Sequence, residues 1–285
     1  MCPSGHIHWY PGHIAKAQRA LKEKLSLVDV VVEVLDARIP LSSAYTDVKS
    51  LCPNKPRLIL MNKVDLVSER DAKEWKRIIE KDNECPVLLT SSGSQKDTNA
   101  IVNKILELSK PVFVELMKKQ LLPRPMRTMV IGMPNVGKSS IINRLVKKSK
   151  TKVGAKAGVT RQQQWVRVHS KIDLLDTPGI IPTVQDNQEA ALKLACVNSI
   201  GENAYDNEHV ARELLRLMES RYEKMLREYY NLEEADITLE NVALARNWIV
   251  KGAEPDLERT AAYILLNFRS GKIGKIILDE FPIQV

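Results

Sequence analysis

The sequence predicts an α/β protein with a mostly parallel, doubly wound sheet, followed by a smaller and mainly α-helical domain. Two observations predict this class. Short apolar runs rich in β-branched residues alternate with helix-like stretches, and long amphipathic stretches replace them after the polar segment 182–188. We therefore expect two domains, residues 1–184 around the sheet and residues 185–285 as a helical domain that binds RNA.

The apolar runs place the strands of the expected sheet. Each run is short, and helix-like stretches separate the runs, as in sheets that are covered on both faces. We expect strands at 28–36, 57–62, 85–92, 128–133 and 172–177. We expect helices at 13–26, 68–82, 97–109 and 138–148.

The C-terminal part has a helical pattern. Apolar residues at Val210, Leu214, Met218, Tyr222, Met225 and Tyr229 form one stripe at helical spacing. A second helix is expected near 239–250. A third should begin at Pro255 and end at Gly271, since Pro favours the first helical position and Gly the stop. A short strand is expected at 273–278.

The uneven charge of the chain indicates what kind of partner it binds. Residues 1–187 carry 31 Lys or Arg against 18 Asp or Glu, whereas residues 188–285 carry 12 against 17. The segment from Lys138 to Lys171 holds ten basic residues and no acidic one, so a polyanion such as RNA is its natural partner. Charge alone leaves DNA, an acidic protein or a solvated loop open.

The cysteines and the apolar runs indicate a cytoplasmic protein that does not enter a membrane. No apolar run approaches the roughly 18 residues of a membrane span. The N-terminal residues lack an apolar signal region. The cysteines show no CxxC spacing, which predicts reduced thiols rather than a disulfide framework or zinc site. They are Cys2, Cys52, Cys85 and Cys196.

The segment GMPNVGKSS, residues 132–140, matches the phosphate-binding pattern GxxxxGK[ST] between an apolar run and a helix-like stretch. Its glycines allow backbone N–H groups to surround phosphate oxygens, and the helix N-terminus adds its positive end. Lys138 would reach the β and γ phosphates, and the Ser139 hydroxyl would bind Mg²⁺. The pattern predicts a nucleoside triphosphate site without choosing the base.

The segment NKVD, residues 62–65, chooses guanine. Asp65 follows a hydrophobic run and can accept hydrogen bonds from N1–H and the 2-amino group of guanine, which adenine does not offer. Asn62 and Lys63 would fix the loop and cover the base. TSS, residues 90–92, ends the next run, so Ser91 or Ser92 could touch the base edge.

Two further segments complete a switch. DTPG, residues 176–179, ends a strand, so Asp176 can hold Mg²⁺ through water and Gly179 can donate its N–H to the γ-phosphate. Thr160 is the candidate switch threonine for Mg²⁺ and the γ-phosphate. Together these segments specify a GTPase. The expected GTP-binding residues are Asn62, Lys63, Val64, Asp65, Ser91, Ser92, Asn135, Val136, Gly137, Lys138, Ser139, Ser140, Thr160, Asp176 and Gly179, with Ser139, Thr160 and Asp176 also at Mg²⁺.

The order of these segments is unusual, because guanine recognition precedes the phosphate loop. A doubly wound sheet tolerates such a circular permutation, in which the strand 28–36 comes spatially after the DTPG strand although it precedes it in sequence. The switch residues 176–182 would then run directly into the helical domain. Ordering them on the γ-phosphate could reorient that domain.

The chain resembles the circularly permuted GTPases of the YlqF type, the ribosome biogenesis GTPase A family. The matching segments occur in family order over nearly the whole chain: WYPGHIAKA, DARIPLS, NKVD, PNVGKSS, GVT, DTPG and GAEPDLERTAAYILLNFRSGKIGKI. One departure is GSQKD at 93–97, where the family is richer in glycine. The resemblance implies binding to a late precursor of the large ribosomal subunit, with GTP hydrolysis coupled to release.

The residue that assists hydrolysis is expected at the other end of the chain. Many GTPases place a water-orienting Gln just after DxxG, but this chain has Ile180 there. His13, on the Pro-Gly turn of HWYPGH, could orient water or stabilise charge, and the resemblance implies the same residue. Trp9 and Tyr10 could instead only pin the N-terminus. A metal cluster of Cys2, His6 and His8 fits no common spacing.

Three functions remain open at the level of sequence. The first is an RNA-dependent GTPase for large-subunit assembly, which we expect to be monomeric off the ribosome. The second is a GTPase for small-subunit maturation or tRNA modification. The third is a module that holds GTP only as a structural ligand. Asn135 also resembles the Asn of GTPases that use K⁺ near the phosphates, so K⁺ is a candidate cofactor beside GTP and Mg²⁺.

Overall fold

The computed structural model describes residues 7, 23–45, 48, 53–91, 94–122, 124–153, 165–176 and 187–282, with backbone only at 95, 148–153, 176 and 202. Its centre is a six-stranded sheet in the order β3-β2-β1-β4-β6-β5. Every neighbouring pair is parallel except β5 and β6, which are antiparallel. The strands are β1 Val30–Asp36, β2 Arg57–Asn62, β3 Val87–Leu89, β4 Met126–Ile131, β5 Trp165–His169 and β6 Ile172–Asp176.

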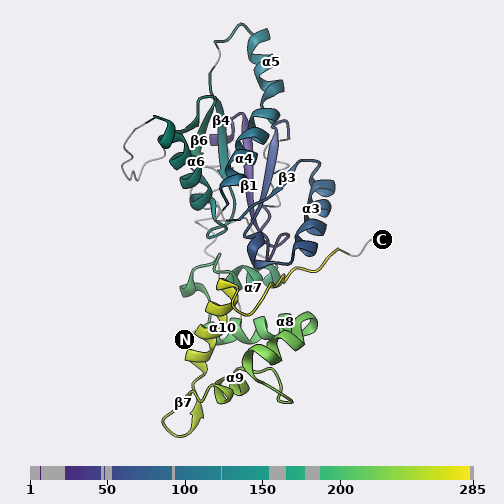
Figure 1. Ribbon diagram of the computed structural model, residues 1–285, viewed down its shortest axis with the longest axis vertical. Coiled ribbons are helices and arrows are strands. Elements are labelled where there is room, and N and C mark those ends of the chain that lie inside the picture. The colour runs from purple at the N-terminus through teal and green to yellow at the C-terminus, as the bar shows by residue number, and fades with distance from the viewer. Residues whose placement is uncertain are drawn as a thin grey trace.

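Helices cover both faces of this sheet (Figure 1). On one face, α4 and α6 pack apolar residues such as Ile101 and Ile141 against Val34 and Leu60. On the other face, Trp75 of α3 packs against Leu35 and other strand residues. The bounds are α3 Glu69–Asn83, α4 Gln95–Leu108, α5 Lys110–Lys118 and α6 Lys138–Val153. The predicted α/β class with a mostly parallel sheet is therefore confirmed.

The C-terminal part is helical and lies beyond one end of the sheet (Figure 1). Helix α10 packs against the other three helices of this part. Asp206 and Asp256 cap α8 and α10 by accepting from backbone N–H groups, and Gly271 ends α10 with φ +72°. The bounds are α7 Gln188–Cys196, α8 Asn207–Tyr230, α9 Leu239–Ala245 and α10 Leu257–Ser270, with a hairpin of β7 Ile249–Val250 and β8 Glu254–Pro255.

Several sequence predictions are wrong in detail. The run 85–92 gives only the short strand β3, and Pro255 lies in β8 rather than starting α10. Segment 273–278 forms no strand. Its N–H groups make separate hydrogen bonds instead, from Ile276 to the carbonyl of Leu66 and from Leu278 to that of Arg38. The Ile277 N–H donates to the Tyr222 hydroxyl of α8, so the segment meets single acceptors rather than a ladder.

The permuted order of the chain is visible in the sheet. Strand β4, which precedes the phosphate loop, lies between β1 and β6. The strand 28–36 and the DTPG strand are therefore not neighbours, because each pairs with a different edge of β4. This arrangement places the ends of β1, β2 and β4 side by side.

Candidate functional site

The carboxyl ends of β1, β2 and β4 point to one edge of the sheet, where parallel α/β sheets bind their ligands. Three loops meet there: residues 36–45 after β1, residues 62–67 after β2, and residues 132–138 after β4. The last of these is the sequence-predicted phosphate loop.

The phosphate loop has a backbone that requires its glycines. Gly132 has φ +146° and Gly137 has φ +105°, and a Cβ on Gly132 would lie 2.5 Å from the carbonyl oxygen of Val34. Helix α6 begins at Lys138, so its first N–H groups face the loop. The Lys138 side chain is buried, with Nζ 2.5 Å from the Met133 carbonyl oxygen. This concave backbone with a helix N-terminus and a buried ammonium suits phosphate groups.

Asn62 joins the predicted guanine loop to the phosphate loop. Its side chain is fully buried, and Nδ2 donates to the carbonyl of Val136 at 2.8 Å. Its Oδ1 accepts from the Thr90 hydroxyl at 3.2 Å. A Cβ on Gly137 would lie only 2.2 Å from Asn62 Nδ2. The two loops are thus one packed unit although 74 residues separate the partners.

Lys63 makes the second link between these loops. It adopts the left-handed conformation with φ +64°, and its Nζ donates to the Asn135 carbonyl at 2.7 Å and to Asp36 at 2.8 Å. Burial lowers the pKa of Lys63, against the opposing charge of Asp36. Burial alone would raise the pKa of Asp36, but Arg38 and Lys63 outweigh it and hold that pKa well below its usual range.

The other residues predicted to contact the base lie in the loop 62–67 and just after β3. Asp65 is exposed in the short 3-10 turn Val64–Leu66, and the Val64 N–H donates to the Thr90 carbonyl. The Ser91 N–H donates to Asp97 at 2.9 Å, and the Ser91 carbonyl accepts from Arg144 of α6. In GSQKD, the segment 93–97 that differs from the family pattern, Ser94 caps α4 by accepting from the Asp97 N–H. Ser139 and Ser140 are exposed at the start of α6.

Other predicted residues cannot be placed in this geometry. His13, Ser92, Thr160 and Gly179 lie outside the described residues, as do Trp9 and Tyr10. Asp176 ends β6 beside Val130 of β4, but its side chain is not described. Ser139 is thus the one expected Mg²⁺ ligand whose side chain the described ranges include. Within those ranges no group of three or more His, Cys, Asp or Glu could hold a metal.

The phosphate loop also contacts the C-terminal part of the chain. Asn135 has φ +58°, and its Nδ2 donates to the Asn198 carbonyl at 2.6 Å. The Ser199 hydroxyl donates to the Pro134 carbonyl at 2.8 Å. Both partners directly follow α7. Sequence reasoning did not find this contact, nor that of Asp36 with Lys63, because only the fold brings these positions together.

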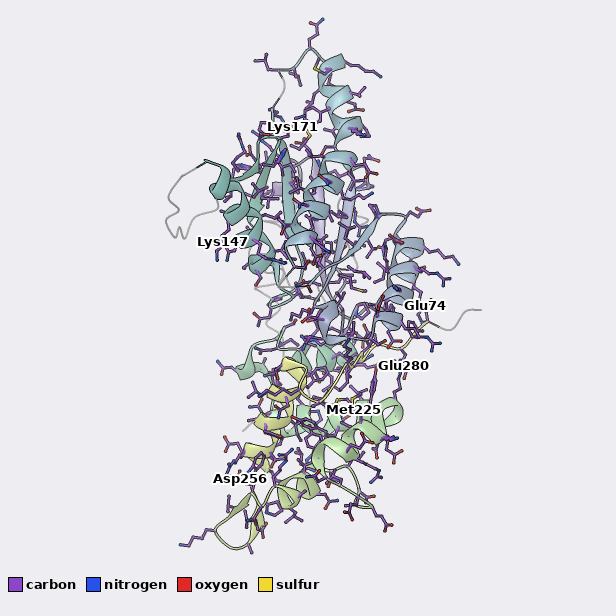
Figure 2. All side chains as sticks on the ribbon, viewed as in Figure 1. Glu74, Lys147, Lys171, Met225, Asp256 and Glu280 are labelled. Carbon is purple, nitrogen blue, oxygen red and sulfur yellow. The ribbon has the colours of Figure 1, made fainter. Side chains whose placement is uncertain are left out.

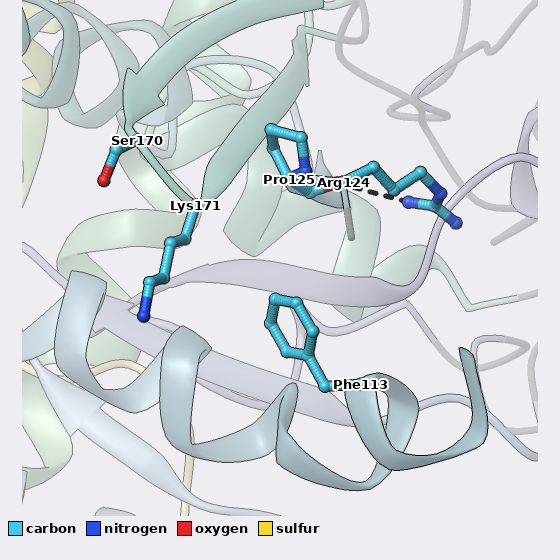
Figure 3. A pocket seen from close by; sticks show the side chains of 5 residues that line it. All are labelled: Phe113, Arg124, Pro125, Ser170 and Lys171. Carbon is cyan, nitrogen blue, oxygen red and sulfur yellow. Dashed lines mark hydrogen bonds between the residues drawn. The ribbon is translucent and has the colours of Figure 1, made fainter. Parts of the chain in front are cut away.

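A separate pocket of about 390 Å³ is lined by residues that precede β4 and β6, at the amino ends of these strands. Figure 3 shows the side chains that line it. Phe113 of α5 faces Pro125 and Lys171 across it, at the start of β4 and in the β5–β6 turn. Arg124 at its rim is already paired with Asp29. Because ligands of such sheets bind at the carboxyl ends of the strands, this pocket is not part of the nucleotide site.

In the part of the chain that the structure describes, no helix is both long and apolar enough to cross a bilayer.

Comparison with known proteins agrees with the geometry of the loops. Residues 127–247 match the family described as 50S ribosome-binding GTPase. The matched range begins in β4 and does not include the loop 62–65, which precedes it in this chain. Ribosome biogenesis GTPase A of Bacillus licheniformis is 37% identical over 278 residues, with 96% of this chain and 98% of that protein covered. The protein of that name from Bacillus cereus is 37% identical over 286 residues, covering 98% and 96%.

A solved structure shows the same arrangement. GNP-bound YlqF from T. maritima superposes with a TM-score of 0.67 at 26% identity, covering 93% of this chain and 97% of that one. At this level of likeness the two chains share their fold. The chain therefore belongs to the ribosome biogenesis GTPase A family, and it is a GTPase that binds GTP.

Proposed function

We propose that this GTPase binds the precursor of the large ribosomal subunit, promotes its late assembly, and couples GTP hydrolysis to its own release. The names of the relatives and the description of the matching family support a ribosomal role and a large-subunit partner. In our proposal residues 1–184 form the GTPase domain and residues 185–285 the helical domain that contacts RNA. The protein acts as a monomer in the cytoplasm before it binds the subunit.

The observation that carries the nucleotide site is the hydrogen bonding between the loop 62–65 and the loop 132–138. It supports the proposal that Asp65, which follows Lys63 in the same loop, reads the base of a nucleotide whose phosphates lie on the phosphate loop. We propose that Asn62, Lys63, Val64 and Asp65 hold the base, together with Ser91 and Ser92. Residues 135–140, Thr160, Asp176 and Gly179 would hold the phosphates.

Mg²⁺ would be held by Ser139 and Thr160, and by Asp176 through water. When bound it neutralises charge that develops on the β and γ phosphates. Asn135 is a candidate ligand for K⁺ at the same phosphates. Its Nδ2 is used by Asn198, so Oδ1 is the atom that it would offer to the cation. Replacement of K⁺ by Na⁺ in a turnover assay tests this point, since a K⁺ site predicts a clear loss of rate.

The distribution of charge favours an RNA partner for the sheet-bearing part. Lys147 of α6 and Lys171 of the β5–β6 turn are exposed on that part, whereas Asp256 and Glu280 lie on the C-terminal part (Figure 2). An RNA phosphate backbone is attracted to the former and repelled by the latter. Any RNA contact of the helical part would therefore use one basic face, for which Arg269, Lys272 and Lys275 are candidates by sequence. The Arg269 guanidinium already donates to the carbonyls of Cys196 and Ala195, so Lys272 and Lys275 are the better candidates.

Addition of purified ribosomal subunits tests the proposal. GTP turnover should rise strongly with large subunits and stay low with small subunits. Stimulation by small subunits or by tRNA instead would favour the alternative, a role in small-subunit maturation or tRNA modification. No stimulation by either subunit or by tRNA contradicts both. Depletion of the protein should in addition cause a late large-subunit precursor to accumulate.

His13 is our candidate for assisting hydrolysis, because Ile180 cannot orient the attacking water. Single-turnover hydrolysis with large subunits present should fall by about 100-fold or more in His13→Ala, the usual range for a lost general base or water-orienting group. His209→Ala, at the start of α8, is the matched control and should hydrolyse GTP at the wild-type rate. Equal rates for all three proteins would exclude His13.

A further inference from the structure

Asp36, the last residue of β1, is a fully buried carboxylate between two cations. Its Oδ1 accepts from Arg38 Nε at 2.9 Å and from the Arg38 backbone N–H at 3.1 Å. Its Oδ2 accepts from Arg38 Nη2 at 2.7 Å and from Lys63 Nζ at 2.8 Å. Both carboxylate oxygens are thus satisfied by charged donors, which fixes the position of each donor as well.

The contact with Lys63 connects this pair to the proposed base site. Lys63 Nζ is held at 2.8 Å by Asp36 on one side and at 2.7 Å by the Asn135 carbonyl on the other. The ammonium group is therefore clamped between β1 and the phosphate loop. A long side chain whose end is clamped in this way has its aliphatic stem in one place, ready to cover an aromatic ring.

Arg38 extends the connection to the C-terminal part. Its side chain is 2% exposed, and Nη1 donates to the carbonyl of Arg269 near the end of α10 at 3.3 Å. The guanidinium also lies over the ring of Phe268, 5.4 Å from its centroid. The Arg38 carbonyl accepts from the Leu278 N–H at 2.8 Å. Arg38, which holds Asp36, is therefore itself held by the end of α10 and by the segment that follows it.

We propose that Asp36 and Arg38 are positioning residues for guanine-nucleotide binding, which act by holding Lys63 and which join the base site to the end of α10. The inference rests on the proposed nucleotide site, in which Lys63 covers the base. A change in the position of α10, such as docking on a large partner would cause, then alters nucleotide affinity through Arg38 and Asp36. This route is separate from the switch residues, since it runs through the base side of the site.

The test is the affinity for GDP and GTP of purified Asp36→Asn, measured by equilibrium titration. We expect both affinities to fall by about tenfold, the effect of one lost charge-assisted contact. Single-turnover hydrolysis of bound GTP should keep its rate, because the base side takes no part in chemistry. Arg38→Lys, which keeps the charge but loses the bidentate geometry, should give a smaller loss of the same kind.

A double-mutant cycle separates positioning from a general structural role. In a Lys63→Met background, Asp36→Asn should cause no further loss of affinity, because the group that it positions is already gone. Glu33→Gln is the matched control. Glu33 is a buried carboxylate of the same strand, paired with Arg57 at 2.8 Å and away from Lys63. It should lower stability while the nucleotide affinity of the folded protein stays at the wild-type value.

The outcomes are distinct. An undiminished loss on adding Asp36→Asn to Lys63→Met overturns the positioning role, as does wild-type affinity in Asp36→Asn. If Asp36→Asn does not fold, the same double-mutant cycle is measured with Arg38→Lys and Lys63→Met, and its result decides the positioning role. If Lys63→Met itself binds GTP like the wild type, or the wild type binds ATP as well as GTP, the proposed nucleotide site fails instead.

Discussion

Asp279, near the end of the chain, anchors the C-terminal segment to the loop after β1. Its buried carboxylate accepts from the N–H groups of Leu41 and Ser42 at 2.8 and 2.9 Å and from the Ser42 hydroxyl at 2.6 Å. It also pairs with Lys193 of α7 at 3.2 Å. Asp279→Ala removes the acceptor of all four contacts. The change therefore tests how strongly the two parts of the molecule are joined.

The expected cost is about 3 kcal/mol in the free energy of unfolding. Removing one partner of a buried ion pair costs about 3–5 kcal/mol. The lower end applies because Lys193 keeps Glu189 at 2.7 Å and because the loop amides are only partly buried, so water can reach them. A chain of this size loses about 2–4 °C of Tm per kcal/mol, which predicts a fall of about 6–12 °C.

Urea unfolding followed by circular dichroism measures this difference. Glu280→Ala changes the neighbouring, exposed carboxylate and is the matched control, with an expected effect within about 0.5 kcal/mol. A loss below about 1 kcal/mol in Asp279→Ala would show that Asp279 does not join the two parts of the molecule strongly. The contacts of Asp279 would then be replaced by water at little cost.

Three other predictions follow from single groups. Gly137→Ala should weaken GTP binding by at least about tenfold in a titration, since its Cβ would lie 2.2 Å from Asn62 Nδ2 at φ +105°; unchanged affinity would argue against the packed loops. Burial raises the pKa of the Cys196 thiol to about 12, so a thiol reagent at pH 7.5 followed by peptide mass analysis should modify the half-buried Cys85 before Cys196, which should react only after unfolding. The lowered pKa of Asp36 means that its contribution to stability is present above the unfolded value of about 4 and lost as pH falls towards the folded value. The difference in unfolding free energy between wild type and Asp36→Asn should therefore be constant above about pH 5 and shrink below pH 4, and a difference that grows on acidification would contradict the assignment.

The central strands could be predicted from sequence because they are buried on both faces and appear as continuous apolar runs. The run at 57–62 agrees with β2 at both ends. The edge strand β5 was missed, because its alternating Trp165-Val-Arg-Val-His169 pattern reflects burial on one side only. The run 273–278 was predicted as a strand for its apolar content. It is buried between two loops that offer no strand to pair with.

The site, like the fold, contains some residues that the sequence reveals and others that only the structure reveals. The phosphate loop and the guanine loop carry their chemistry in consecutive residues, so their patterns could be recognised before the fold was known. Asp36 and Arg38 act through partners 27 and 231 residues away, and the Asn135 contact spans 63 residues. Only the sheet order and the course of the C-terminal segment bring such groups together. Residue type alone does not reveal them.

We propose that two loops in permuted order form one guanine-specific site, in which Asp65 reads the base. Asp65→Asn tests it most directly, since the amide suits the 2-oxo group of xanthine and no longer accepts both guanine protons. Titration with GTP and XTP should show GTP affinity lower by about 100-fold or more and XTP affinity raised above that of the wild type. Unchanged GTP affinity, with no gain for XTP, would contradict the account.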